Sequence, residues 1–98
     1  MSEIRILDRA SKFVEALSIH NKAKVAASMS MLRDGRFELV RIKKLRNKIK
    51  ELIVKDCRFT FFIHDSKLYF VSGFIKKNNK TPKHEIDYTE NIYKLITK

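Results

Sequence analysis

The sequence predicts an α+β domain in which an N-terminal helical hairpin packs on a small, twisted, mainly antiparallel sheet and one helix ends the chain. Two observations support this prediction. Apolar residues recur at helical spacing between residues 8 and 34, and hydrophobic residues alternate along the segment CRFTFFIHDSKLYFVSGFI, residues 57–75. A length of 98 residues suits one small core, so residues 1–98 are interpreted as a single domain.

The N-terminal elements are predicted to be a short strand and two helices. Ile4 and Ile6 flank Arg5, which suits a short strand. Asp8 is expected to cap the first helix and Asn21 the second. Their apolar faces comprise Ala10, Phe13, Val14 and Leu17 in the first helix, and Val25, Ala26, Met29 and Leu32 in the second. Because the connection is short, the helices should form an antiparallel hairpin.

The middle of the chain is predicted to be a loop followed by three strands. Gly35 fits the position just after the second helix. Residues 36–47 follow neither a helical nor a strand period for any length, so we expect a loop that contains one helical turn. The strands are predicted at about 48–55, 57–64 and 67–75, with the turn HDSK between the last two.

A final helix should follow a cationic junction. Thr81 suits its N-cap and Pro82 its first position. The apolar side of this helix comprises Ile86, Tyr93 and Ile96. The junction between the last strand and this helix has four lysines and no acid: Lys76, Lys77, Lys80 and Lys83.

Strand alternation predicts which side chains share a face of the sheet. The residues expected to pack on the helical hairpin are Leu52, Val54, Cys57, Phe59, Phe61 and Ile63. Those expected on the opposite, more open face are Glu51, Ile53, Arg58, Thr60, Phe62 and His64. Glu51 and Arg58 should therefore lie on one concave surface, either as an ordinary cross-strand ion pair or as part of a functional site.

The composition favours a polyanionic partner. The net charge is +11 and the pI is about 10.0, which favours RNA, DNA, an acidic protein or an acidic membrane surface. Residues 41–50 contain six cations and no acid, so this run is either a solvated surface or a direct RNA or ribosome contact.

Several classes of site and location are not expected. A single cysteine, Cys57, excludes an internal disulfide and fits a reducing cytoplasm. The charged start MSEIRILDRA is unlike a signal peptide, and no apolar run approaches the roughly 20 residues that span a bilayer. The three histidines lack the spacing of metal ligands, and the two glycines form no phosphate-binding loop, so neither a metal nor another cofactor is predicted.

Specific segments resemble a known protein family. These are Lys43-Lys44-Leu45, Glu51-Leu52, Arg58 and the continuous run GFIKKNNKTPKHEI from Gly73 to Ile86. Together they resemble the HigB-like branch of the RelE superfamily, which includes phage-derived host-inhibition proteins. The order of helices and strands fits as well, so the resemblance covers nearly the whole chain, and the run from Gly73 to Ile86 is its specific part.

The resemblance implies a RelE-like fold and the toxin of a type II toxin–antitoxin pair. Such toxins are ribosome-associated mRNA endonucleases that act without a metal and are held inactive by an antitoxin, commonly a HigA-like helix-turn-helix protein. For such a reaction the residues themselves suggest Glu51 as base, because it is the only carboxylate expected on the open face beside Arg58. Arg58 is expected to be the phosphate clamp, with Lys77 and Lys80 as further cations. The RNA-binding candidates are Lys43, Lys44, Arg46, Lys48, Lys55, Lys76, Lys83 and His84, and His64 is a second possible acid beside His84.

One departure from the family pattern keeps two alternatives open. Ile53 stands where the family motif has an arginine that would face phosphate. The chain could therefore be a ParE-like inhibitor of DNA gyrase, or an RNA-binding relative that no longer cleaves. The lysine-rich run before Pro82 argues against the gyrase inhibitor.

Overall fold

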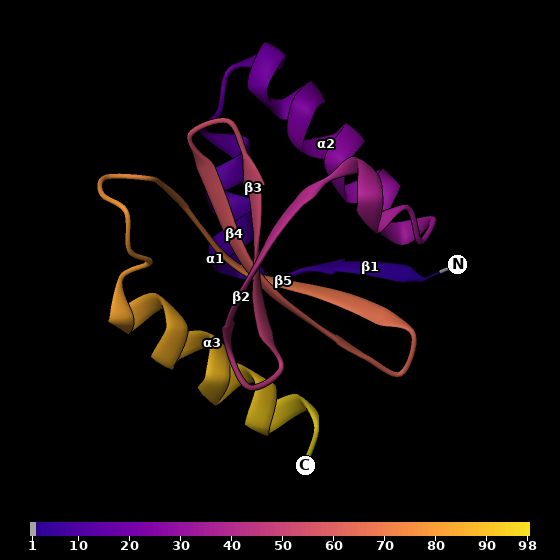
Figure 1. Cartoon of the computed structure of the whole chain (residues 1–98), viewed down its shortest axis with the longest axis vertical. Coiled ribbons are helices and arrows are strands. Elements are labelled where there is room, and N and C mark those ends of the chain that lie inside the picture. The colour runs from indigo at the N-terminus through magenta and orange to yellow at the C-terminus, as the bar shows by residue number, and fades with distance from the viewer. Residues whose placement is uncertain (1) are drawn as a thin grey trace.

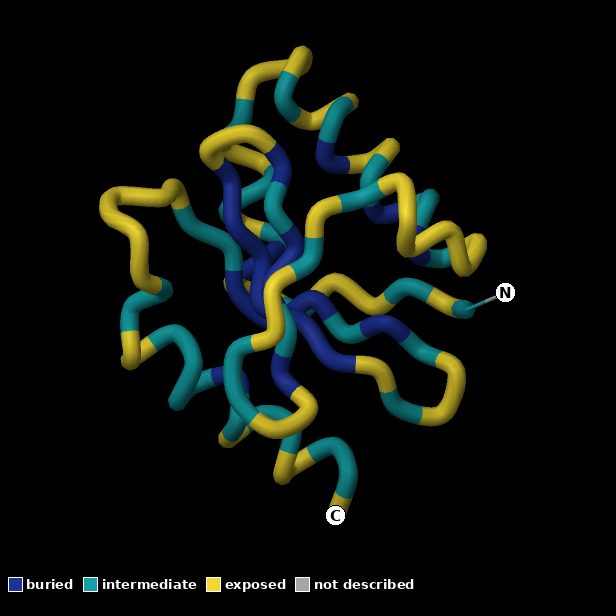
Figure 2. The backbone as a smooth tube through the Cα atoms, viewed as in Figure 1, coloured by how far each residue is buried: buried dark blue, intermediate teal, exposed yellow. Residues whose placement is uncertain are grey.

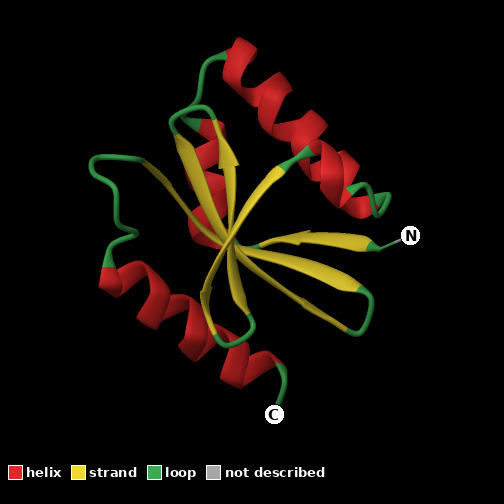
Figure 3. Ribbon diagram, in the orientation of Figure 1, coloured by secondary structure: helices red, strands yellow, loops and turns green. Residues whose placement is uncertain are grey.

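The computed structural model describes residues 2–98 and has the predicted α+β architecture. A five-stranded sheet has the strand order β1-β5-β4-β3-β2, with all neighbours antiparallel except β1, which runs parallel to β5 (Figures 1 and 3). The strands are β1 Glu3–Ile6, β2 Arg41–Arg46, β3 Ile49–Val54, β4 Cys57–His64 and β5 Lys67–Ile75. The helices are α1 Asp8–Glu15, α2 Ile19–Arg33 and α3 Lys83–Ile96. Within residues 2–98, no helix is long and apolar enough to cross a membrane.

Helices α1 and α2 cover one face of the sheet, as the alternation predicted. The core on this face joins residues of both helices to Leu52, Val54, Cys57, Phe59 and Phe61. Phe59 is fully buried, with its ring edge-on to Phe13 of α1 at a centroid distance of 5.5 Å. The prediction for Ile63 is wrong, because this side chain is 38% exposed near the end of β4.

Helix α3 covers part of the opposite face (Figure 1). A smaller core there contains Ile49, Phe62 and Val71, packed against aromatic and aliphatic side chains of α3. Phe62 lies edge-on to Tyr93 at 4.9 Å. This core occupies one end of the face and leaves the other end, toward the start of β4, free for polar side chains.

The predictions for residues 36–47 are partly wrong. The expected helical turn is present as a short 3₁₀ helix, η1 Phe37–Leu39, but the rest forms the edge strand β2. A β-bulge between Lys44 and Arg46 shifts the register. Because of the bulge, the neighbouring residues Leu45 and Arg46 both face α3: Leu45 packs with the α3 core, and Arg46 bonds acids of α3, which breaks the simple alternation of a strand.

The predicted caps of the first two helices are also wrong. Helix α1 begins at Asp8 itself, and the N-cap of α2 is Ser18, whose hydroxyl accepts the backbone N–H of Asn21. Gly35 follows α2 with a φ of 79°, the left-handed conformation expected there. The HDSK hairpin is confirmed, since Asp65 and Ser66 both have positive φ, as a two-residue turn requires.

Candidate active site

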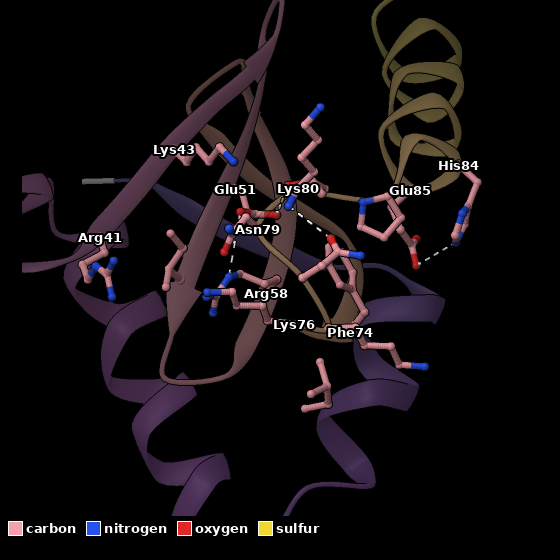
Figure 4. Close-up of a pocket in the computed structure, with 16 residues that line it drawn as sticks. Arg41, Lys43, Glu51, Arg58, Phe74, Lys76, Asn79, Lys80, His84 and Glu85 are labelled. Atoms are coloured by element: carbon pink, nitrogen blue, oxygen red, sulfur yellow. Dashed lines mark hydrogen bonds and ion pairs between the residues drawn. The ribbon is translucent and has the colours of Figure 1, made fainter.

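A cleft of about 350 Å³ opens on the face of the sheet that α3 covers only in part. Its walls are the β2–β3 ribbon, the connection 76–82 between β5 and α3, and the first turn of α3 (Figure 4). Residues 76–80 of this connection are exposed (Figure 2). The connection leaves the sheet immediately beyond Ile75 and turns back over the strands, so its lysines border the cleft.

Two rows of cross-strand neighbours run across β3, β4 and β5 at the cleft. The outer row is Ile53, Arg58 and Phe74, and all three side chains line the cleft. The inner row is Glu51, Thr60 and Ser72. Cross-strand partners project to the same face of a sheet, and so do residues two apart on one strand. Ile53 is the partner of Arg58 and is two residues from Glu51, so Glu51 and Arg58 lie on one face, as the alternation predicted.

Glu51 is almost completely buried, at 3% exposure. Its Oε2 accepts a hydrogen bond from the Thr81 hydroxyl at 2.6 Å, and its Oε1 lies 4.0 Å from Nε of Arg58 (Figure 4). A carboxylate in this position is shielded from bulk water, faces a guanidinium and is held by one hydroxyl donor. Such fixed partners set the direction in which a carboxylate can accept a proton.

Arg58 is held as firmly as Glu51. Its Nη1 donates to the backbone carbonyls of Lys55 at 2.6 Å and Cys57 at 3.0 Å. Lys55 adopts a φ of 55° in the turn between β3 and β4, and this turn brings its carbonyl back toward the guanidinium. These bonds orient Arg58 at the start of β4, where it lines the cleft and can meet a bound anion.

The structure brings only some of the predicted cations to this cleft. Those lining it are Lys43, Lys76, Lys77 and Lys80, together with Arg41 and His84. Lys44, Lys48, Lys55 and Lys83 do not line it. His64 is at the far end of β4, paired in register with Lys67, and is not part of the cleft.

Arg46 is also outside the cleft, where it anchors α3. Its Nη1 donates to Asp87 at 2.8 Å and to Glu90 at 3.0 Å, and these bonds raise the pKa of Arg46. Lys83 bonds the other oxygen of Asp87 at 2.9 Å. These cations are thus partnered by acids of α3, which makes them less available to a polyanion.

Sequence reasoning missed four residues of the site: Arg41, Ser72, Thr81 as a partner of Glu51, and Glu85. Glu85 lines the cleft, and its Oε1 accepts the Ser72 hydroxyl at 2.5 Å. No faces were predicted for the strand at 67–75, where a bulge between Phe70 and Ser72 breaks the alternation. Arg41 was predicted only as part of the cationic run 41–50, in a segment expected to be a loop.

The chemistry of this cleft comes from one buried carboxylate beside one guanidinium, with lysines around them. A carboxylate can take a proton, and a guanidinium with nearby ammonium groups can stabilise the charge of a phosphate. Within residues 2–98, no group of three or more His, Cys, Asp or Glu side chains could hold a metal ion.

Comparison with known proteins places the chain in a family and a fold. The family described as "Phage derived protein Gp49-like (DUF891)" matches residues 12–94. Comparison with curated proteins gives no match. The fold is similar to a chain of the archaeal RelE–RelB complex from Pyrococcus horikoshii OT3, with a TM-score of 0.69 and 12% identity over 80% of this chain and 98% of that one. It is also similar to a chain of the RelB–RelE antitoxin–toxin complex from Methanococcus jannaschii, with a TM-score of 0.63 and 11% identity over 85% of this chain and 95% of that one. The RelE-like fold predicted from the sequence is therefore confirmed.

Proposed function

The chain belongs to the Gp49-like family of phage-derived proteins, and from this premise we propose that it is the toxin of a type II toxin–antitoxin pair that cleaves mRNA on the ribosome. The RelE-like fold supports the proposal, since the similar chains come from complexes of RelE with RelB. The observation that supports the proposal best is the cleft, where Oε1 of Glu51 lies 4.0 Å from Nε of Arg58 and lysines line the surrounding walls.

The proposed reaction is a transesterification within the RNA. Glu51 takes the proton of a ribose 2′-hydroxyl, and the 2′-oxygen forms a bond to the adjacent phosphorus. The bond from phosphorus to the 5′-oxygen breaks, and an acid gives that oxygen a proton. The products are a 2′,3′-cyclic phosphate and a 5′-hydroxyl, and the need for a 2′-hydroxyl restricts the substrate to RNA.

The remaining roles follow from position in the cleft. Arg58 would bind the phosphate, and Lys77 and Lys80 would stabilise the charge that develops on it. His84 is the favoured acid over His64, because it lines the cleft and its Nε2 lies 3.6 Å from Oε2 of Glu85. Lys43 and Lys76 would bind neighbouring phosphates of the strand. No step of this reaction requires a metal.

The proposed partners fit the charge of the protein. An antitoxin with an acidic segment, here proposed to be a HigA-like helix-turn-helix protein, would complement the net charge of +11. Ribosomal RNA is a polyanion as well, and the cations outside the cleft, such as Lys44 and Lys48, are proposed to contact it. Both partners would be met in the cytoplasm.

The test is induced expression in a bacterial host with mapping of mRNA 5′ ends. New ends within translated codons are expected for the wild type and not for an Arg58→Ala variant produced at the same level. The control is Lys94→Ala, which removes a cation of α3 outside the cleft. A folded Arg58→Ala variant that still cuts mRNA would overturn the role of this arginine, and growth arrest without cuts would overturn the nuclease.

A second candidate function is a toxin that binds its target without cleaving RNA. Ile53 favours it, because it places an apolar side chain beside Arg58 where the resembling family has a further cation. Growth arrest without new mRNA ends would support this candidate, and gyrase inhibition in the same cells would identify the ParE-like form.

A further inference from the structure

Three hydroxyl hydrogen bonds tie the inner row of the sheet to the segment that closes the cleft. Glu51 accepts from Thr81 at 2.6 Å, Thr60 contacts Thr89 at 2.6 Å, and Ser72 donates to Glu85 at 2.5 Å. Thr89 in turn donates to the backbone carbonyl of Glu85 at 2.8 Å, so the proton between the two threonines comes from Thr60. Every residue of this row therefore has a partner on α3 or just before it.

The bond from Thr81 to Glu51 takes the place of an expected helix cap. The sequence predicts Thr81 as the N-cap of the last helix, but Pro82 holds that position and α3 has no side-chain cap. A threonine that caps a helix accepts a hydrogen bond from the backbone, whereas Thr81 donates its proton to a carboxylate on β3. The hydroxyl is thus directed at the side chain proposed as the base.

The position of Thr81 is fixed from both sides. The Thr60–Thr89 and Ser72–Glu85 bonds hold the first turns of α3 over the sheet. Before Thr81, the side chain of Asn78 accepts the backbone N–H of Lys80 at 3.1 Å and shapes the connection. A donor held in this way presents its proton to Glu51 without the entropy cost of ordering a free side chain.

We propose that Thr81 is a positioning residue for the cleavage reaction: its hydroxyl occupies Oε2 of Glu51 and leaves Oε1, the oxygen nearer to Arg58, to take the proton of the 2′-hydroxyl. This inference rests on the proposed function.

Other charged groups share the cleft with Glu51. They are Arg41 and Lys43 on β2, Arg58 on β4, the lysines of the connection, and His84 and Glu85 on α3. A change at Thr81 leaves all these charges in place. A fall in kcat on removing this hydroxyl is therefore attributable to the lost hydrogen bond.

The experiment compares Thr81→Val and Thr81→Ser in cleavage of an mRNA on purified bacterial ribosomes. Valine keeps the shape of threonine without the hydroxyl, and serine keeps the hydroxyl. Since a hydrogen bond to a charged group is worth more than a neutral one, kcat of Thr81→Val should fall by roughly 10- to 100-fold with KM nearly unchanged. Thr81→Ser should restore the wild-type kcat.

The matched control is Thr97→Val, which removes a hydroxyl bonded to the carbonyl of Tyr93 at the other end of α3. Its kcat should match the wild type. A folded Thr81→Val variant with wild-type kcat would overturn the inference while leaving the nuclease in place. A kcat that serine fails to restore would also overturn it, and a wild type that cuts no mRNA would overturn the proposed function together with this role of Thr81.

Discussion

The two faces of β4 show how one strand serves two purposes. On the face toward α1 and α2, Cys57, Phe59 and Phe61 are all buried in a continuous apolar core. On the other face the character changes along the strand, from Phe62 under α3, through Thr60 in a hydroxyl pair, to Arg58 in the cleft (Figure 4). The first face stabilises the fold. On the second face, apolar residues are replaced along the strand by polar and then charged residues, which are positioned for the cleft.

This comparison explains why a nearly buried ionic pair can persist in a small protein. Removing charge from water is costly unless each group has hydrogen-bond partners. Glu51 and Arg58 have such partners in Thr81 and in two backbone carbonyls. Within residues 2–98 no buried side-chain nitrogen or oxygen lacks a partner, so the polar face is fully satisfied.

The largest difference in unfolding free energy is expected between two phenylalanines on opposite faces of the sheet. Phe59 is fully buried between Phe13 and Phe70, and Phe59→Ala should lower the free energy of unfolding by about 3–5 kcal/mol. Phe74 lines the cleft and is only partly buried, so Phe74→Ala should cost roughly 1 kcal/mol. Urea unfolding measures the free energy of both variants. Equal losses of unfolding free energy would contradict the view that the face toward α1 and α2 contributes more to stability than the cleft face.

A smaller effect is expected where α1 approaches β5. A Cβ atom added at Gly73 would lie 2.6 Å from Cδ2 of Phe13, closer than real contacts allow. Gly73→Ala should therefore displace Phe13 and lower the free energy of unfolding by about 1–3 kcal/mol. In a Phe13→Ala background the contact with Cδ2 is gone and only the Cβ of residue 13 remains near, at 3.0 Å, so the same substitution should cost less. Additive losses would show that this close approach is not the cause.

Sequence reasoning succeeded where one physical rule dominates. Alternation alone assigned Cys57, Phe59 and Phe61 to the core and placed Glu51 with Arg58, because one face of β3 and β4 is continuously covered by helices. It was wrong for Ile63, which is partly exposed near the end of β4. It was not applied to the two segments that carry β-bulges, near Lys44 in β2 and between Phe70 and Ser72 in β5, where an extra residue interrupts the alternation.

Hydrogen bonds between residues far apart in the sequence were the other limit of prediction from the sequence. Thr81 fits the pattern of a helix cap in sequence, and only the folded chain brings its hydroxyl to Glu51, 30 positions earlier. The same holds for Arg46, which looked like part of a free cationic run but lies against Asp87 and Glu90. Composition fixes the number of charges, whereas the fold decides which of them remain available.

That availability can be tested at Lys80, which borders the cleft. Lys80→Gln should weaken binding of a single-stranded RNA several-fold, and should reduce the magnitude of the log–log salt slope by roughly 0.7 if one phosphate contact is lost. Lys94→Gln removes the same charge from α3 outside the cleft and should have less effect. Titrations at several salt concentrations measure both slopes, and identical slopes would indicate that RNA does not enter the cleft.

The smallest effect is expected at the cluster that anchors α3 to the β2–β3 hairpin. Hydrogen bonds from Lys83 and Arg46 lower the pKa of Asp87, and those from Asn47 and Arg46 lower the pKa of Glu90. A carboxyl whose pKa is lower in the folded state than in the unfolded state stabilises the fold at any pH above its unfolded pKa, here near 3.8 for Asp87 and 4.5 for Glu90. That stabilisation is lost as the pH falls through the pKa of the folded state.

Arg46→Gln should therefore flatten the dependence of unfolding free energy on pH in the range from about 5 to 2, as measured by urea unfolding. The change should be modest because the groups are partly exposed and water screens them. Lys48→Gln, at a lysine for which residues 2–98 supply no ion pair, controls for the lost charge and should keep the wild-type slope. If Arg46→Gln keeps that slope as well, the cluster does not anchor α3. The cleft wall would then depend on the hydroxyl bonds of the inner row and on the Phe62 core.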